Sequence, residues 1–201
     1  MPISAVVFDI GGVLEINDDA LFPDPWRERH GFSRDRLDAA FDLPGDPAIG
    51  EVTQVEIRAH LQRELSLSDA QVDELEQDMW RWYVGELDRE LYDWFAGLRG
   101  RGLAVAILSN SGPGGREREA CWGFEALVDV LVYSHEVGLK KPDPAIYALT
   151  TERLGVPPDE IAFLDNWLPA VEAARTAGWH AIHHIDTATS NRTTLEELIA
   201  R

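Results

Sequence analysis

Five short apolar runs constrain the fold of this chain more than any other feature. They cover residues 5–9, 103–109, 128–133, 161–165 and 180–185. Each run is apolar almost throughout, which is typical of strands that helices cover on both faces of a parallel sheet. Helical stretches separate the later runs. The pattern therefore predicts an open α/β sheet with right-handed crossover connections.

The helices between the later strands carry recognisable end signals. A stretch over 144–154 follows Asp143, a good N-cap residue, and stops at Gly155. A second stretch over 168–178 has a proline in its first turn and ends at a glycine. Strand, helix and strand thus alternate along the second half of the chain.

The connection between the first two predicted strands is far too long for one crossover helix. It runs from about residue 15 to about residue 102, and its content is helical. Thr53 and Glu56, for example, form a capping box at the start of one of its helices. We therefore expect a small helical cap over 16–88, inserted into a core made of residues 1–15 and 89–201.

Charge and cysteine content exclude some partners. The chain has 201 residues and a net charge of −18, which argues against binding to nucleic acid or to an anionic membrane surface. No apolar run is long enough to span a bilayer. The single cysteine, Cys121, rules out an internal disulfide and predicts a cytoplasmic location. The oligomeric state is left open.

Polar residues follow four of the predicted strands, at the edge where ligands of open α/β sheets bind. Taken alone, each is an ordinary turn or cap residue; their order along successive strand ends is what suggests a site. The candidates are Asp9 and Gly11 after the first strand, Ser109 and Asn110 after the second, Lys141 after the third, and Asp165 and Asn166 after the fourth.

This set of residues suits phosphoryl transfer. Asp9 could attack phosphorus and form an acyl phosphate. Asp9 and Asp165 could hold Mg²⁺, which needs few protein oxygens. Lys141 could neutralise phosphate charge, and the Ser109 hydroxyl could donate to a phosphate oxygen. Lys140 and Lys141 are the only lysines among eighteen basic residues, which fits either an arginine bias or a need for a compact ammonium group.

Four segments resemble the motifs of the haloacid dehalogenase-like hydrolase superfamily. They read FDIGGVL, ILSNS, GLKKPDPAIY and FLDN, and the resemblance covers residues 5 to about 185. The chain looks most like small sugar-phosphate phosphatases with a helical cap after the first strand. The resemblance implies a Rossmann-like core and a small phosphorylated substrate.

The resemblance also assigns roles to single residues. Asp9 matches the nucleophile, Lys141 the catalytic lysine, and Ser109, with Asn110 beside it, the phosphate-binding segment. Asp9, the carbonyl of Gly11 and Asp165 match the ligands of Mg²⁺. Asn166 is expected beside the metal without touching it.

Two departures from the family pattern concern catalysis. The phosphatases carry an acid two residues after the nucleophile, where this chain has Gly11, and a second acid where it has Asn166. Loss of a general acid typically costs 10²–10⁴-fold in rate. Glu15, Asp18 or Asp19 could supply a proton from the start of the insert, but the sequence does not place them, and we expect them to be solvated residues of a linker.

Three activities therefore stay open on the sequence. The first is a magnesium-dependent phosphatase. The second is a metal-independent 2-haloacid dehalogenase-type hydrolase, which would not need the missing acid; it ranks lower, because the chain keeps Asp165 and has Ala170 where the acid of the dehalogenases would fall. The third is a degenerate protein that binds phosphate without turnover.

Elsewhere, the charged run 115–120 is expected to be an exposed helical face, and Trp80 and Trp82 are expected to be packing residues of the cap.

Overall fold

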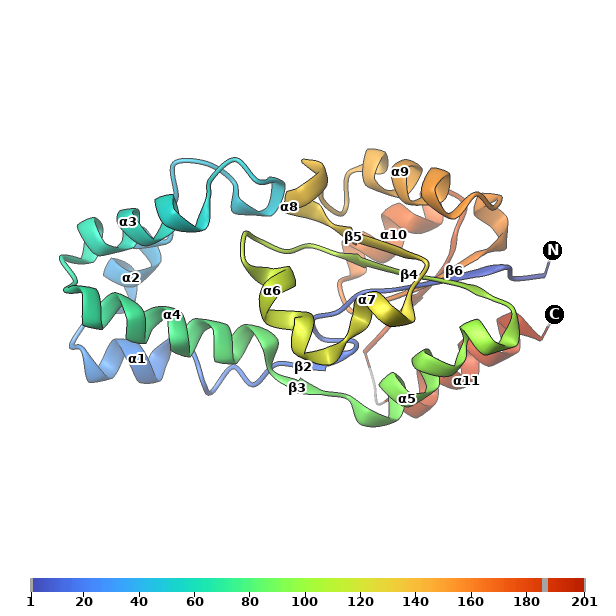
Figure 1. Ribbon diagram of the computed structural model, residues 1–201, viewed down its shortest axis with the longest axis horizontal. Helices are drawn as coiled ribbons and strands as arrows, with labels where there is room; N and C mark the ends of the chain where they lie inside the picture. The colour runs from blue at the N-terminus through green and yellow to red at the C-terminus, as the bar shows by residue number, and fades with distance from the viewer. Residues whose placement is uncertain (1, 186–187, 201) are drawn as a thin grey trace.

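A five-stranded parallel sheet forms the centre of the protein in the computed structural model, which describes residues 2–185 and 188–200 (Figure 1). The strand order is β5-β4-β1-β6-β7. The strands are β1 (Ala5–Phe8), β4 (Ala104–Ser109), β5 (Val130–Tyr133), β6 (Ile161–Asp165) and β7 (His180–His183). The predicted α/β fold and its five strands are confirmed, with strand ends shifted by two residues at most.

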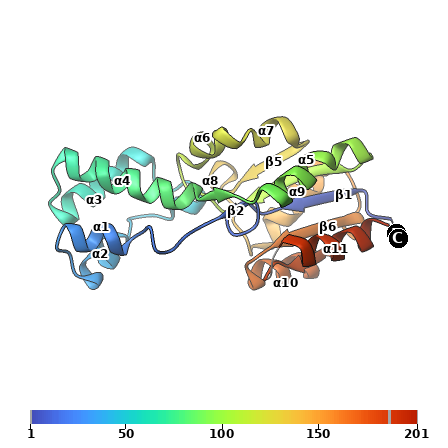
Figure 2. The same cartoon turned by 90° about the horizontal axis from the view of Figure 1, so that it is seen from below.

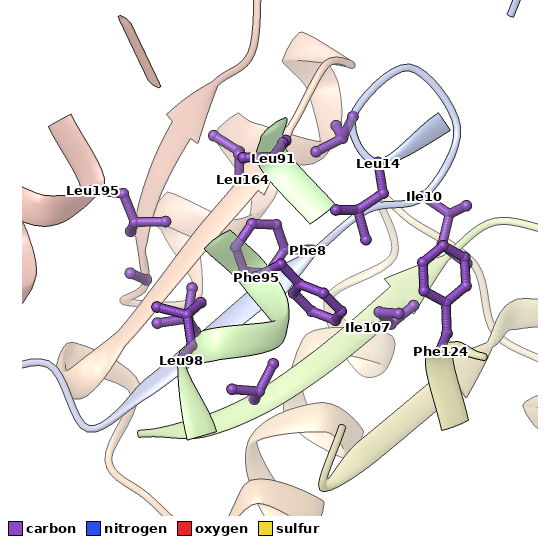
Figure 3. Packing of buried hydrophobic residues seen from close by; sticks show 14 of the residues in the cluster. Phe8, Ile10, Leu14, Leu91, Phe95, Leu98, Ile107, Phe124, Leu164 and Leu195 are labelled. Atoms are coloured by element: carbon purple, nitrogen blue, oxygen red, sulfur yellow. The ribbon is translucent and has the colours of Figure 1, made fainter. Parts of the chain in front are cut away.

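Helices cover both faces of the sheet, because successive side chains of a strand point to opposite faces. Phe8 of the central strand packs against Phe95 of α5 (Arg89–Gly97), in a cluster that also includes Phe124 of α7 (Phe124–Leu127) and Leu195 of α11 (Ala188–Ile199), as Figure 3 shows. Val7 faces the other way, toward α9 (Pro144–Leu154) and α10 (Leu168–Thr176). Two separate apolar clusters result, one on each side of β1.

A group of four helices stands at one end of the sheet (Figures 1 and 2). The helices are α1 (Asp24–Arg29), α2 (Arg34–Ala40), α3 (Gln54–Leu65) and α4 (Asp69–Val84). They share an apolar cluster of their own, in which Trp26, Leu37 and Val72 are fully buried. This is the segment for which a cap is expected; the exact domain boundaries stay a prediction.

A two-stranded antiparallel ribbon joins this helical group to the core. It consists of β2 (Glu15–Ile16) and β3 (Glu86–Leu87). The chain leaves the core through β2 and returns to it through β3. The ribbon was not expected, because two residues are too few to show a strand pattern.

The remaining elements are short and connect the larger ones. They are α6 (Gly115–Glu119), α8 (Ser134–Val137) and the 3₁₀ turns Pro47–Ile49, Arg99–Arg101, Ala120–Trp122 and Pro158–Glu160. Within the part of the chain that the structure describes, no helix has both the length and the apolar character needed to cross a membrane.

Candidate active site

A cavity of about 210 Å³ opens beyond the carboxyl ends of β1 and β4. Residues of the sheet edge line its floor, and residues from the β2 ribbon, α4 and α6 line the rest. The lining consists of Asp9, Gly11, Gly12, Glu15, Asn17, Trp82, Tyr83, Ser109, Asn110, Glu119 and Asn166. Five of the seven predicted site residues thus face one cavity, while Lys141 and Asp165 lie behind Asp9.

Lys141 bridges the two predicted aspartates. Its Nζ atom lies 2.8 Å from Asp9 Oδ1 and 2.6 Å from Asp165 Oδ2. The lysine side chain is only 2% exposed. Burial alone would lower the pKa of Lys141, but the charges of Asp9 and Asp165 outweigh burial and raise it. Lys141 is therefore held as a buried cation beside the candidate nucleophile.

The backbone of Lys141 is fixed by Asn110. The Asn110 side chain accepts a hydrogen bond from the Lys141 amide at 2.8 Å and donates one to the Lys141 carbonyl at 2.9 Å. Asn110 follows β4, so this pair of bonds ties the lysine loop to the second strand end. Asn110 lines the cavity as predicted, but its amide group also positions Lys141.

Asp165 is fully buried, and the structure uses both of its carboxylate oxygens. Oδ2 meets Lys141, and Oδ1 accepts a hydrogen bond of 2.7 Å from the amide of Trp167. Its neighbour Asn166 lines the cavity instead. The two residues of this strand end therefore point to different surroundings: one toward the lysine, the other toward the cavity.

Asp9 occupies the floor of the cavity. Its Oδ1 atom meets Lys141 and accepts a hydrogen bond of 2.9 Å from the amide of Ile10. Burial raises the pKa of Asp9 to about 6 against the opposing charge of Lys141, and the charge of Asp165 adds to the rise. Asp9 is thus a carboxylate at neutral pH, poorly solvated and open to the cavity.

Gly12 has to be glycine for two reasons. Its φ angle is +73°, which residues with a side chain rarely adopt. A Cβ atom at this position would also lie 2.0 Å from Asn166 Nδ2. The Asn166 side chain therefore packs directly over the loop that follows the candidate nucleophile.

Glu15 contradicts the expectation of a solvated linker. The amides of Val13, Leu14 and Glu15 all donate to the Ile10 carbonyl, at 2.8–3.0 Å, and this tight turn brings Glu15 back to the cavity wall. Glu15 is 1% exposed, whereas Asp18 is exposed, as expected.

The Glu15 carboxyl group has one satisfied oxygen and one unsatisfied oxygen. Oε1 accepts a hydrogen bond of 2.6 Å from Trp122 Nε1. Oε2 is buried and has no hydrogen-bond partner among the described residues. Burial raises the pKa of Glu15 to about 9, and the charge of Glu119 contributes. Glu15 therefore carries a proton at neutral pH.

Glu119 is the second buried acid that the sequence did not reveal. The run 115–120 was expected to be exposed, yet Glu119 is 2% exposed and lines the cavity. The reason is close packing of α6: a Cβ atom on Gly115 would lie 2.1 Å from Ser111 Oγ. The hydroxyl of Tyr133 donates to Glu119 at 2.5 Å, and burial raises the pKa of Glu119 to about 7.

The end of α4 forms part of the cavity wall, through Trp82 and Tyr83. Asn17 donates to the carbonyls of Trp82 and Tyr83, at 2.9 and 2.8 Å, and so ties the ribbon to the end of α4. The Tyr83 hydroxyl donates to Ser111 Oγ at 2.7 Å, which connects α4 to the loop after β4. Trp82 was expected to be a packing residue, but it also lines the cavity.

The residue types at the cavity floor suit a magnesium ion. Asp9, Gly11 and Asn166 line the cavity and carry a carboxylate, a backbone carbonyl and an amide oxygen. Mg²⁺ is often held by one or two carboxylates while water and substrate phosphate supply its other ligands. Within residues 2–185 and 188–200, no three acidic, histidine or cysteine side chains gather as an all-protein metal cluster. An open site of this kind needs no such cluster.

The fold and this strand-edge site define an α/β enzyme core with an inserted helical segment above its cavity. The sequence profile of haloacid dehalogenase-like hydrolases matches residues 3–178. The chain belongs to this family and is a hydrolase, as the resemblance predicted. Phosphatase MT3486 of Mycobacterium tuberculosis is 33% identical over 190 residues, which cover 90% of this chain and 87% of the relative. Phosphatase activity is therefore favoured over dehalogenation.

Solved structures share the fold over nearly the whole chain. The family enzyme bt-2542 of Bacteroides thetaiotaomicron, solved with magnesium and inorganic phosphate, superposes with a TM-score of 0.75 at 21% identity and covers 94% of this chain and 98% of its own. A dehalogenase superposes with a TM-score of 0.61, also at 21% identity, and covers 92% of this chain and 86% of its own. At these identities both comparisons establish the fold and leave the reaction to the site.

Proposed function

We propose that the protein is a magnesium-dependent phosphatase of a small phosphorylated metabolite and that Asp9 is its nucleophile. The observation that carries the proposal is the buried chain of contacts from Asp9, at the floor of the cavity, through Lys141 to Asp165. A lysine in this position neutralises charge at the floor and keeps the attacking carboxylate ionised.

The residues around Asp9 have distinct parts in this reaction. An Asp9 oxygen forms a bond to phosphorus as the bond to the leaving oxygen breaks, which gives an aspartyl phosphate. Ser109 is 3% exposed and lines the cavity, where its hydroxyl can donate to a phosphate oxygen. Water then cleaves the acyl phosphate and restores Asp9.

Asp9, the Gly11 carbonyl and Asn166 would hold the magnesium ion, which neutralises phosphate charge when it is bound. This assignment differs from the sequence-based one, in which Asp165 is a ligand. Both Asp165 oxygens already have partners, Lys141 and the amide of Trp167. We therefore assign Asp165 to the positioning of Lys141, and the metal contact at this strand end to Asn166.

The size of the cavity supports a small substrate. A volume of about 210 Å³ is below the range of about 300–1,000 Å³ that is usual for drug-sized ligands. The phosphatase relative supports the same function. Dehalogenation remains the second candidate, because it needs no acid at Gly11.

The test is turnover of phosphate esters, with p-nitrophenyl phosphate and a panel of small metabolite phosphates as substrates. We expect hydrolysis that stops on addition of EDTA, returns with Mg²⁺, and is lost in Asp9→Asn. Asp18→Asn is the matched control, because Asp18 is exposed and lies outside the cavity. Absence of turnover for every ester would refute the proposal, and metal-independent chloride release from 2-chloropropionate would favour the second candidate.

A further inference from the structure

The proposed reaction needs a proton donor, and the nucleophile loop does not supply one. When the bond between phosphorus and the leaving oxygen breaks, an alkoxide forms unless a nearby acid protonates it. Gly11, at the position where the family carries an acid, has no side chain. The donor has to come from another element that reaches the cavity.

We propose that Glu15 is this donor, and that the same carboxyl group later accepts a proton from the attacking water. Glu15 lines the cavity together with Asp9, and its Oε2 atom is buried without a partner among the described residues. The proposal rests on the phosphatase function proposed above.

The hydrogen bond from Trp122 fixes which oxygen is available. Trp122 Nε1 donates to Oε1 at 2.6 Å, so this oxygen is held as an acceptor. The proton of a neutral carboxyl group then resides on Oε2, the oxygen that lacks a partner. A buried carboxyl oxygen without a partner is costly in a folded protein, so its retention in a residue that lines the cavity points to a catalytic role for this oxygen.

Other polar groups of the cavity are less suited to the task. Asn17 uses its amide nitrogen on two backbone carbonyls. The Tyr83 hydroxyl donates to Ser111, and burial raises the pKa of Tyr83 far above its usual value. Glu119 already accepts a hydrogen bond from Tyr133. Among the described acids that line the cavity, Glu15 is the one with a buried carboxyl oxygen that has no partner.

The proton balance closes over both half-reactions. In the first, the Asp9–phosphorus bond forms, the bond to the leaving oxygen breaks, and the Glu15 proton moves to that oxygen, so a neutral alcohol leaves. In the second, water attacks phosphorus, its proton moves to the Glu15 carboxylate, and the Asp9–phosphorus bond breaks. Phosphate leaves, and both Asp9 and Glu15 return to their starting states.

The decisive experiment compares esters with good and poor leaving groups in Glu15→Gln, a nearly isosteric variant that cannot give up a proton. For an alkyl phosphate such as glycerol phosphate, we expect kcat/KM to fall about 10²–10³-fold. For p-nitrophenyl phosphate, whose leaving group needs no proton, we expect kcat/KM to stay within about threefold. The same variant should release p-nitrophenol in a burst of about one equivalent per enzyme, because hydrolysis of the acyl phosphate is now slow.

Two further variants distinguish the loss of a proton donor from a general loss of folded protein. Trp122→Phe retains Glu15 but removes the hydrogen bond to Oε1, so it should lose activity on the alkyl ester and keep activity on p-nitrophenyl phosphate. Glu119→Gln changes the other buried carboxyl group of the cavity and should affect both esters by the same factor.

The outcomes separate the two proposals. If the unaltered protein hydrolyses both esters but Glu15→Gln loses the same factor on each, or none on the alkyl ester, then Glu15 is not the donor and the phosphatase function stands. A leaving-group effect in Glu119→Gln alone would identify Glu119 as the proton donor and overturn the assignment to Glu15. No hydrolysis by the unaltered protein would overturn both proposals.

Discussion

Replacement of Lys141 by methionine is the sharpest test of the buried charge arrangement. The chain has two lysines, adjacent in sequence, and their surroundings differ completely. Lys141 is 2% exposed and meets two carboxylates, whereas Lys140 is 44% exposed and pairs with Asp46 at the surface. Lys140→Met is therefore a matched control for Lys141→Met.

The expected loss of stability follows from the charges that Lys141→Met leaves behind. Removal of one partner from a buried ion pair typically costs about 3–5 kcal/mol, because the other charge stays buried without compensation. Here Asp9 and Asp165 both lose their cation, so we expect a cost of at least this size at pH 8. An exposed pair contributes about 0–1 kcal/mol, which is the expected cost of Lys140→Met.

The cost of Lys141→Met should also depend on pH. The pKa of Asp9 is already raised to about 6 with the lysine present, and loss of the lysine raises it further. A carboxyl group with a raised pKa destabilises the fold above its unfolded pKa and regains stability as it takes up a proton. Each pKa unit corresponds to about 1.4 kcal/mol, so the penalty should shrink by about 2 kcal/mol between pH 8 and pH 5.

The assay is unfolding in guanidinium chloride, followed by tryptophan fluorescence, at pH 5 and at pH 8. The wild type, Lys141→Met and Lys140→Met are compared at each pH. Equal losses for the two variants would contradict the buried position of Lys141. A loss in Lys141→Met that does not change with pH would show that lost packing, and not unpaired carboxylate charge, causes the instability.

Three further predictions concern the same cavity. Glu15 has a pKa of about 9 in the folded protein, so its burial costs stability as pH rises above about 4.5; Glu15→Gln should raise the melting temperature by about 10 °C or more at pH 8 and hardly at pH 4, as measured by differential scanning fluorimetry, and an equal shift at both pH values would contradict it. Gly12→Ala should cost about 1–2 kcal/mol or more in the free energy of unfolding and weaken Mg²⁺ binding, because the added Cβ displaces Asn166; unchanged calorimetric affinity would refute the contact. Asn166→Asp should tighten Mg²⁺ binding about tenfold or more, and an unchanged Kd would remove Asn166 from the proposed metal site.

The strands and the strand-edge residues could be predicted because both depend on local pattern. An apolar run of the length of 161–165 shows itself without any knowledge of its neighbours, and β6 spans the same residues. Once a parallel sheet is expected, the residues after its strands must meet at one edge. The contacts of Lys141 with Asp9 and Asp165 follow from that rule.

The two buried glutamates could not be predicted, because their burial depends on contacts between distant segments. Glu15 is covered by Trp122, 107 residues further along the chain. Glu119 is held by Tyr133 and turned inward by the packing of Gly115 on Ser111. In sequence, one follows two buried apolar residues and the other ends a charged run, and neither pattern separates a buried acid from an exposed one.

The absence of acids at Gly11 and Asn166 has an electrostatic consequence for Glu15. Asp9, Asp165 and Lys141 together carry one excess negative charge beside the cavity. Each further carboxylate there would add repulsion in a poorly solvated site. With a glycine and a neutral amide at these two positions, the proposed reaction would bind its metal through Asp9 and take its proton from Glu15, so that metal binding and proton donation would belong to two different elements. Asn166→Asp should therefore increase the affinity for Mg²⁺ without supplying a proton donor. Glu15→Gln should show the same leaving-group effect in the presence and in the absence of the Asn166→Asp substitution. A double variant that regains activity on alkyl phosphates would show that an acid at residue 166 can replace Glu15.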